Sequence, residues 1–384
     1  MTDVEAIHTA AMVIDAHADI EVPGRESPYV GVDGRSRVAP DKLAAGDVDA
    51  VVLSVAAGPG PRTEKGQQSA RRVADRKLNA VMDLVGDSAN EMVLATTADE
   101  VVAAKDQGLR AVVLGFQNTQ IIGTDIDALD SFYEAGCRVF ALTHIGHNDC
   151  ADSSRPMYFA ATAKHEPDDE HGGLSPVGRD AIRRINDLGG LVDVSQLSMN
   201  AALQVLEFAD APVIASHSNV RALCDVSRNL SDAELDGIAA GGGVVHVAPF
   251  LGYLYDTTNE ALLAGIVEAR REVGLPEKYQ YPFELYWELE GSDAQVQFRD
   301  RIRRILGKAS VENVIDHVDY IVAMLGIEHV GIGTDFNHGG GIKGFLEADE
   351  APNVTAALMA RGYSAENIDL IWGQNFLRAL RSVE

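Results

Sequence analysis

The sequence predicts a (β/α)₈ barrel of the TIM type, formed by residues 1–384 as a single α/β domain with inserted loops and helices. Eight short apolar segments rich in β-branched residues are spread along the chain, and segments with helical periodicity lie between most of them. No G-x-G-x-x-G motif follows the first apolar segment, where a dinucleotide-binding open sheet would need one. We therefore favour a closed barrel, which removes sheet edges, over a doubly wound open sheet.

The eight segments read as parallel strands that are covered on both faces. Each is bounded by Gly, Asp, Asn or His and lacks the alternation of a half-exposed strand. They comprise residues 12–16, 50–56, 111–116, 138–143, 191–195, 212–216, 244–248 and 329–334.

Helical periodicity predicts the crossover connections. Ser231 followed by Glu234 forms a capping box, and Gly189 with Gly190 ends a helix after Leu188. The predicted helices lie at 69–86, 127–136, 176–190, 200–210, 231–243 and 310–326. Three connections are too long to be ordinary loops, so we expect active-site loops and, in the last of them, a helical excursion. These are residues 20–48, 152–173 and about 250–310.

Composition and charge exclude several classes of partner. The chain has 58 acidic and 32 basic residues, a formal charge of −26, which repels phosphate backbones and anionic lipid. We therefore expect no nucleic-acid and no membrane partner. The N-terminus has no basic region leading into an apolar run, so no signal peptide is expected. Cys137, Cys150 and Cys224 are an odd number and far apart, which favours reduced thiols and a cytoplasmic protein.

The carboxyl ends of the predicted strands carry candidate ligands for a metal. Catalytic groups of such barrels come from these ends. His17 and Asp19 follow the first strand two residues apart, so both side chains point to one side and can bind one cation. On its own, this pair could simply contain a strand-end histidine that is hydrogen-bonded to the backbone. However, His217 follows the sixth strand and Asp335 follows the eighth. Because a divalent metal needs three or four N or O donors on one concave surface, these four residues predict a metal site.

Several motifs resemble the membrane (renal) dipeptidase family of the amidohydrolase superfamily over nearly the whole chain. They are VIDAHAD, LTHIGHNDCAD, GGLSPVGRDAIRRINDLGGLVDVSQLS, PVIASHSNVRALCDVSRNL, GGVVHV and VGIGTDF. The resemblance implies a barrel that binds two metals, usually zinc, and hydrolyses dipeptides, with tolerance for a D-configured or dehydro C-terminal residue. It also implies a homodimer as the expected assembly.

The resemblance assigns a role to each matching residue. It implies His17 and Asp19 as ligands of the first metal, and His217 as a ligand of the second. Asp335 would handle the proton of the attacking water, and His144 would steady the oxyanion. Arg228 would bind the substrate carboxylate and Tyr253 would line the pocket, the alternatives being a surface ion pair for Arg228 and plain packing for Tyr253.

Two positions depart from the family pattern. Gln117 stands where the family has a metal-bridging glutamate, and Gln196 where it has a histidine in a D-x-S-H turn. A neutral carboxamide binds a divalent cation more weakly than carboxylate or imidazole. We therefore expect one firm Zn²⁺, held by His17, Asp19 and Asp335 with His217 as a further ligand, and a second site that is weak or absent. His338 is interpreted as a solvated loop histidine that could replace a missing ligand.

The leading functional hypothesis is a metal-dependent hydrolase that cleaves the amide bond of dipeptides or dipeptide-like substrates. A single Zn²⁺ can still activate water and polarise a carbonyl. The two glutamines keep two alternatives open. One is a non-hydrolytic tailoring enzyme or isomerase acting on a peptide-derived metabolite, and the other is a catalytically impaired barrel that binds a small molecule. The substrate's side chains and stereochemistry are left open.

Overall fold

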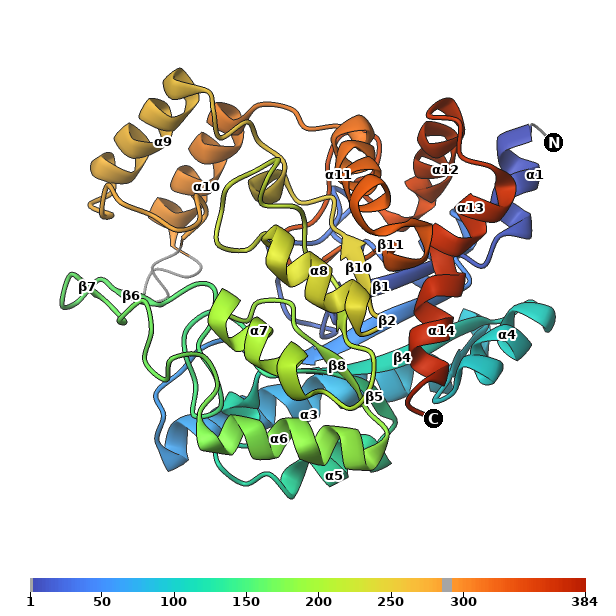
Figure 1. The fold of residues 1–384 in the computed structure, drawn as a ribbon, viewed down its shortest axis with the longest axis horizontal. Helices are drawn as coiled ribbons and strands as arrows, with labels where there is room; N and C mark the ends of the chain where they lie inside the picture. Colours follow the sequence, from blue (N-terminus) through green and yellow to red (C-terminus); the bar gives the residue numbers. More distant parts are fainter. Residues whose placement is uncertain (1–2, 285–291) are drawn as a thin grey trace.

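The computed structural model describes residues 3–284 and 292–384, and its centre is a closed parallel barrel (Figure 1). Eight strands neighbour one another in the order β1-β2-β4-β5-β8-β9-β10-β11. Their bounds are β1 (Ile14–Asp19), β2 (Ala50–Ala56), β4 (Arg110–Gln117), β5 (Cys137–Ala141), β8 (Leu191–Asp193), β9 (Ile214–Ala215), β10 (Val244–Val247) and β11 (Val330–Ile332).

The last strand returns beside the first and closes the barrel. Ala18 forms a parallel bridge with Phe336, and the Asp19 N–H donates to the Phe336 carbonyl at 2.8 Å. The Asp335 N–H donates to the His17 carbonyl, also at 2.8 Å. Each of the eight predicted segments contains or overlaps one barrel strand, so the predicted fold class is confirmed.

Two strands run further than the apolar pattern indicated. The sequence places His17 and Asp19 after the first strand, but both lie within β1, where Asp19 still pairs with Ser54 of β2. Gln117 is likewise the last residue of β4. Backbone pairing continues past the apolar run because it does not depend on the side chain, so the polar residues project from strand and not from loop.

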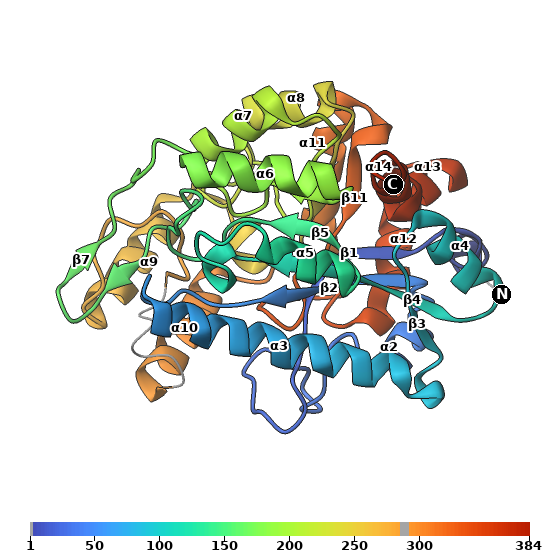
Figure 2. The same cartoon turned by 90° about the horizontal axis from the view of Figure 1, so that it is seen from below.

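Helices cover the outside of the barrel. Figure 2 shows α3 along one side, with α6, α7 and α8 on the other. The helix at 231–243 has the predicted capping box, and Gly189 ends the helix at 176–190 in the left-handed conformation (φ 80°). The helices are α1 (Asp3–Ala10), α2 (Pro40–Ala45), α3 (Glu64–Gly86), α4 (Ala98–Asp106), α5 (Ala128–Glu134), α6 (Pro176–Leu188), α7 (Met199–Phe208), α8 (Asp232–Ala240), α11 (Val311–Leu325), α12 (Ala351–Ala360), α13 (Ala365–Asp369) and α14 (Asn375–Arg381).

The long connections carry elements of their own. The short strand β3 (Met92–Leu94) pairs with the start of β4 outside the ring of eight. A hairpin of β6 (Tyr158–Phe159) and β7 (Lys164–His165) occupies the connection at 152–173. Helices α9 (Glu260–Glu272) and α10 (Asp293–Leu306) lie together at the same end of the molecule as this hairpin (Figure 1).

A separate apolar cluster supports the helical excursion. It packs aromatic side chains from the loop after β10, including Phe250 and Tyr253, against Phe298 and Ile302 of α10. This packing fixes α10 beside the barrel mouth. Among the described residues, no helix has the length and apolar character that crossing a bilayer requires.

The three cysteines are buried and unbonded. Burial raises the pKa of Cys137 to about 12 and that of Cys150 to about 11. Because the thiolate is the reactive form, these thiols are inert at neutral pH.

Candidate metal centre and active site

Polar side chains from six strand ends meet at one rim of the barrel. His17 and Gln117 lie within β1 and β4, and the other members follow β5, β8, β9 and β11. Each is at most 3% exposed although each is polar. The set consists of His17, Gln117, His144, Gln196, His217 and Asp335. Buried polar groups at this density are costly unless they bind one another or a ligand.

The backbone of the rim is strained at several of these positions. Asn118, Gln196, Asp335 and Asn337 are non-glycine residues with φ of 85°, 71°, 54° and 62°. Left-handed backbone at such residues costs on the order of 1–3 kcal/mol and collects at functional sites. The positive φ values at these four residues favour a functional role for the rim.

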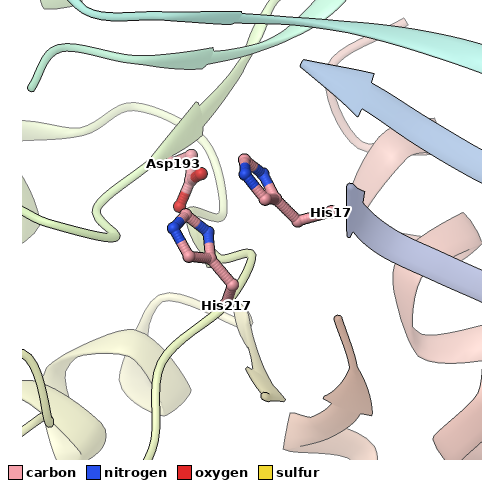
Figure 3. Close-up of side chains that lie close together, drawn as sticks. All are labelled: His17, Asp193 and His217. Atoms are coloured by element: carbon pink, nitrogen blue, oxygen red, sulfur yellow. The ribbon is translucent and has the colours of Figure 1, made fainter. Parts of the chain in front are cut away.

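His17, His217 and Asp193 form one compact cluster (Figure 3). Potential ligand atoms of the three residues lie within 4.8 Å of one another, and the two imidazole rings stack with centroids 3.8 Å apart. Burial lowers the pKa of His17 to about 3 and places that of His217 well below its usual value. Both rings are therefore neutral, which is the form that binds a metal.

Asp193 orients the histidines through Ser216. Its carboxylate accepts from the Ser195 N–H at 2.8 Å, the Ser216 N–H at 3.0 Å and the Ser216 hydroxyl at 2.5 Å. The Ser216 Oγ lies 2.8 Å from His217 Nδ1 and 3.3 Å from His17 Nδ1. Because the hydroxyl proton points to Asp193, Oγ accepts from the imidazoles, so both carry their proton on Nδ1 and direct the Nε2 lone pair elsewhere.

The sequence analysis did not single out Asp193. The D-x-S turn after the fifth strand is the signal that could have found it. Its oxygens are already saturated by hydrogen bonds, so we interpret Asp193 as the residue that positions Ser216 and not as a metal ligand.

The lone pair of His217 is engaged by Gln196. The Gln196 Nε2 lies 3.1 Å from His217 Nε2, and the Gln196 Oε1 accepts from the Arg155 guanidinium at 3.0 Å. The amide must therefore donate to His217. A continuous chain of hydrogen bonds runs from Arg155 through Gln196, His217 and Ser216 to Asp193.

Arg155 is a site residue that the sequence analysis missed. It belongs to the connection at 152–173, and its guanidinium lies 5.1 Å from the centroid of the Tyr281 ring. The Arg155 Nε is buried and has no hydrogen-bond partner within the described chain. No local motif marks this arginine, because only the path of its loop brings it to the rim.

Asp19 is paired with a lysine from outside the rim. Lys77 of α3 donates to the Asp19 Oδ1 at 2.5 Å. Burial raises the pKa of Asp19, but the charge of Lys77 and the hydrogen bonds from Lys77 and the Ile20 N–H help to bring it below its usual value. Asp19 is therefore ionised, with its second oxygen available to a cation. Nothing in the helical pattern of 69–86 identifies Lys77.

Asp335 presents an unpaired oxygen to the site. Its Oδ1 is buried and has no hydrogen-bond partner among the residues that the structure describes. Burial raises the pKa of Asp335 to about 7, against the opposing charges of Arg228 and Arg155. Such a carboxyl group can hold or release a proton near neutral pH.

His144 and His338 form a stacked pair. Their ring centroids are 4.6 Å apart, and His144 Nε2 lies 3.3 Å from His338 Nδ1. The His144 Nδ1 is buried and without a partner in the described residues. The interpretation of His338 as a solvated loop histidine is wrong, because its side chain is only 18% exposed and contacts both His144 and Asp335. The turn after β11 folds it back into the site.

Arg228 is buried beside His217. It is 2% exposed, donates to the Ser218 Oγ at 3.3 Å and to the His217 carbonyl at 3.0 Å, and its Nε has no partner in the described chain. The alternative of a surface ion pair is therefore wrong. Tyr253 lies beneath it, with the guanidinium 4.9 Å from the ring centroid. Tyr253 both packs in the aromatic cluster and lines the cavity at the barrel mouth.

Two cavities open onto the rim. One of about 340 Å³ reaches Asp335, His338 and Arg155, and another of about 270 Å³ reaches Asp19, Lys77 and His144. Tyr29 lines both, with its ring edge-on to His338 at 5.5 Å. A larger cavity of about 710 Å³ extends from Ala57 to Glu166, but none of the rim residues lines it.

The ligand chemistry of His17, Asp19 and Asp335 suits a divalent cation, whereas the described cluster whose ligand atoms lie within 4.8 Å of one another is that of His17, Asp193 and His217. His17 offers a neutral Nε2, Asp19 an ionised carboxylate, and Asp335 an unpaired buried oxygen. Imidazole and carboxylate are the ligands of catalytic zinc. The positions that the family resemblance assigns to a second metal provide weaker ligands. Gln117 and Gln196 are carboxamides, and the lone pair of His217 already accepts a hydrogen bond.

A closed barrel with histidine and carboxylate donors at the carboxyl ends of its strands is the arrangement typical of TIM-barrel metalloenzymes. Residues 1–384 match the family model "Membrane dipeptidase (Peptidase family M19)". The chain therefore belongs to this family of metal-dependent peptidases, as its motifs predicted.

Individual relatives agree with this assignment. The chain is 30% identical to "Dipeptidase tcpJ" of Claviceps purpurea over 80% of its length, and 26% identical to human "Dipeptidase 3" over 83%. These matches cover 58% and 53% of the two relatives. The chain thus spans little more than half the length of these curated relatives.

Solved structures share the fold over the full chain. The probable dipeptidase PvdM from Pseudomonas aeruginosa is 33% identical, with a TM-score of 0.87 over 99% of this chain and 97% of that one. A metallo peptidase from Rhodobacter sphaeroides, solved with a phosphinate mimic of the dipeptide L-Ala-D-Ala, is 20% identical with a TM-score of 0.71, covering 97% and 99%. The second likeness shows the fold alone.

Proposed function

We propose that this protein hydrolyses the amide bond of dipeptides or dipeptide-like substrates with one resident divalent cation. The observation that carries the proposal is the unpaired, buried Oδ1 of Asp335, beside the neutral His17 and the ionised Asp19. An isolated buried carboxyl oxygen is costly, and a cation or a water molecule would satisfy it.

The cation would be held by His17, Asp19 and Asp335. When bound, such an ion polarises the scissile carbonyl and lowers the pKa of a water molecule. Asp335 accepts the proton of the attacking water and returns it to the leaving amine through its buried oxygen, which has no hydrogen-bond partner among the described residues.

His144 and Arg228 bind the two ends of the reacting group. A proton on His338 Nδ1 is donated to His144 Nε2, which leaves the His144 Nδ1–H free to stabilise the developing oxyanion. The Nε of Arg228, without a partner in the described chain, binds the substrate carboxylate, as a free dipeptide requires.

We further propose that the cation count is one. The second set of donors is blocked because Gln196 occupies the lone pair of His217 and holds the charged Arg155 against the same space. A fixed guanidinium disfavours a second divalent ion through charge repulsion. The protein should therefore contain about one metal ion per chain by mass-spectrometric metal analysis.

Restoring the family residues at positions 117 and 196 tests the number of bound metal ions. The triple variant Gln117→Glu, Gln196→His, Arg155→Ala should raise the metal content towards two ions per chain. The single variant Arg155→Ala is the matched control and should stay near one. A wild-type protein that already binds two tightly held ions would contradict the proposal.

A dipeptide panel with metal analysis separates the competing functions. Turnover that is lost on chelation and restored by Zn²⁺ supports the hydrolase. Bound metal without turnover of any dipeptide would favour a tailoring enzyme or isomerase, and neither metal nor turnover would favour a small-molecule binder. The cytoplasmic location and the homodimer stay predictions.

A further inference from the structure

The cavity that opens onto Asp335 is lined by arginines. Arg37, Arg155, Arg299 and Arg303 all line it, together with Tyr29. Asp335 is the one acidic residue that lines this cavity in the described chain. On a protein with a formal charge of −26, this concentration of positive charge stands out from the rest of the surface.

Arg299 is buried and has no carboxylate partner among the residues that the structure describes. It is 8% exposed, its guanidinium lies 4.3 Å from the centroid of the Tyr29 ring, and no described acidic residue lies within 4.0 Å of it. A cation–π contact offsets only part of the cost of burying a charge.

Arg37 and Arg303 are less isolated, because the charges of Glu347 and Glu350 act on Arg37 and the Arg303 side chain is 46% exposed. Arg37 donates its Nε to the Tyr29 carbonyl at 2.8 Å and its Nη1 to the Leu346 carbonyl, both neutral acceptors. The nearest described acid to Arg303 is Asp300, at 3.9 Å. Burial lowers the pKa of both guanidiniums, and the charge of Arg299 lowers that of Arg303 further.

Other arginines near these segments pair normally. Arg301 of α10 lies against Glu272 and Glu268 of α9, and Arg35 pairs with Asp41. Acidic residues are therefore available nearby, yet Asp335 is the one acidic residue among the described residues that lines the cavity. The charge of the cavity is a local feature and not a consequence of overall composition.

We propose that Arg37, Arg299 and Arg303 form an anion subsite for a second acidic group of the substrate. The preferred substrates are then dipeptide-like acids with a carboxylate in addition to the α-carboxylate that Arg228 binds. This inference rests on the proposed function, because the cavity joins the subsite to Asp335. Guanidinium groups bind carboxylates through paired, charge-assisted hydrogen bonds, and the cavity is of the size of small-molecule sites.

The kinetic test compares matched substrates. For the wild type, kcat/KM should be higher for dipeptides with one glutamate side chain, at either position, than for the same dipeptides with glutamine. The double variant Arg299→Gln, Arg303→Gln should reduce that ratio by roughly 10-fold to 100-fold, the loss expected for one or more charge-assisted hydrogen bonds. Arg301→Gln on the same helix removes an equal charge outside the cavity and should leave the ratio unchanged.

A binding experiment separates this inference from the hydrolase proposal. Glutarate is the probe, with acetate as the single-carboxylate comparison, measured by calorimetry on the full chain after chelation of metal. Wild type should bind glutarate at least ~10-fold more tightly than the double variant does, whether or not dipeptides are hydrolysed. Thermal melting of the double variant near the wild-type temperature shows that it is folded.

Two outcomes would overturn the subsite. One is an equal kcat/KM of wild type for glutamate and glutamine dipeptides together with glutarate binding that does not change in the double variant. The other is a loss of discrimination in Arg301→Gln as large as in the double variant, since that would attribute the effect to overall charge. In both cases hydrolysis of neutral dipeptides could persist, so the hydrolase proposal would stand.

Discussion

Two layers of the barrel mouth contain buried aspartates that serve different purposes. In the lower layer, Asp15 and Asp193 each accept three hydrogen bonds, two of which tie one strand to its neighbour. In the upper layer, Asp335 leaves an oxygen unpaired and Asp19 pairs only in part. Burial is not what separates the layers, since Asp15, Asp193 and Asp335 are all at most 4% exposed.

The two layers differ in whether hydrogen bonds occupy both oxygens of the buried carboxylate, and this difference decides its role. Asp15 accepts from the Thr334 N–H at 2.8 Å and the Thr334 hydroxyl at 2.6 Å, and Asp193 makes the same two kinds of bond to Ser216. These bonds hold adjacent strand ends in register. The free oxygen of Asp335 has no such structural use, so it is the group available for chemistry.

The largest expected effect is on catalysis in the upper layer. Asp335→Asn removes a ligand and the proton carrier, so turnover should fall by more than ~1000-fold. The free energy of unfolding should be unchanged or higher, because the variant removes a poorly paired buried carboxyl group. Steady-state kinetics and chemical denaturation measure the two quantities. Retained peptidase activity in this variant would refute the proton role.

The lower layer should respond in the opposite way. Asp193→Asn replaces one carboxylate oxygen by an amide NH₂ group, which faces the hydrogen-bond donors of Ser195 and Ser216 and cannot accept from them. The free energy of unfolding should therefore fall by about 2–4 kcal/mol. Asp83→Asn, at an exposed position of α3, is the control and should change it by less than about 0.5 kcal/mol. A wild-type denaturation midpoint for Asp193→Asn would show that these hydrogen bonds do not hold the strand ends.

Within the upper layer, paired substitutions of His144 locate the active nitrogen. His144→Gln places an amide near the position of Nε2, and His144→Asn places one near Nδ1, the atom without a described partner. If Nδ1 stabilises the oxyanion, kcat should fall by roughly 100-fold in the glutamine variant and clearly less in the asparagine variant, with KM little changed. The reverse order would assign the contact to Nε2.

The smallest expected effect lies outside both layers, in the pH dependence of stability. His317 is 3% exposed, its Nδ1 accepts from the Val220 N–H at 3.0 Å, and burial lowers its pKa to about 4. The unfolded chain binds a proton at this residue below about pH 6.5, whereas the folded chain does so only near pH 4. Stability from His317 is therefore complete above pH 6.5 and declines as the pH falls through this window.

His317→Asn keeps an acceptor at the δ position and removes the titration. Between pH 7 and pH 5 the wild type should lose about 1–2 kcal/mol more of its free energy of unfolding than the variant does. Denaturation curves at the two pH values give this difference. Identical pH profiles would show that His317 does not titrate differently on folding.

Much of the site followed from one rule about strand ends. His17, Asp19, His217 and Asp335 were predicted because they follow or end apolar runs, and His144 was predicted from the family resemblance. The structure brings the elements of all five to one rim. The exact ends of β1 were not predicted, since backbone pairing continues beneath polar side chains. Lys77 and Arg155 were not predicted, because each reaches the rim from an element whose own pattern carries no functional signal.

The sequence by itself determined the barrel, the family and the chemical character of the rim, because the composition of a buried parallel strand and the identity of the residue at its end are local properties. Tertiary structure alone decided which donors remain free. The engagement of His217 by Gln196, the return of His338 into the site and the gathering of Arg37, Arg299 and Arg303 around one cavity join residues far apart in the chain. Such contacts depend on the paths of long loops and the orientation of side chains, and no periodicity along the sequence encodes either.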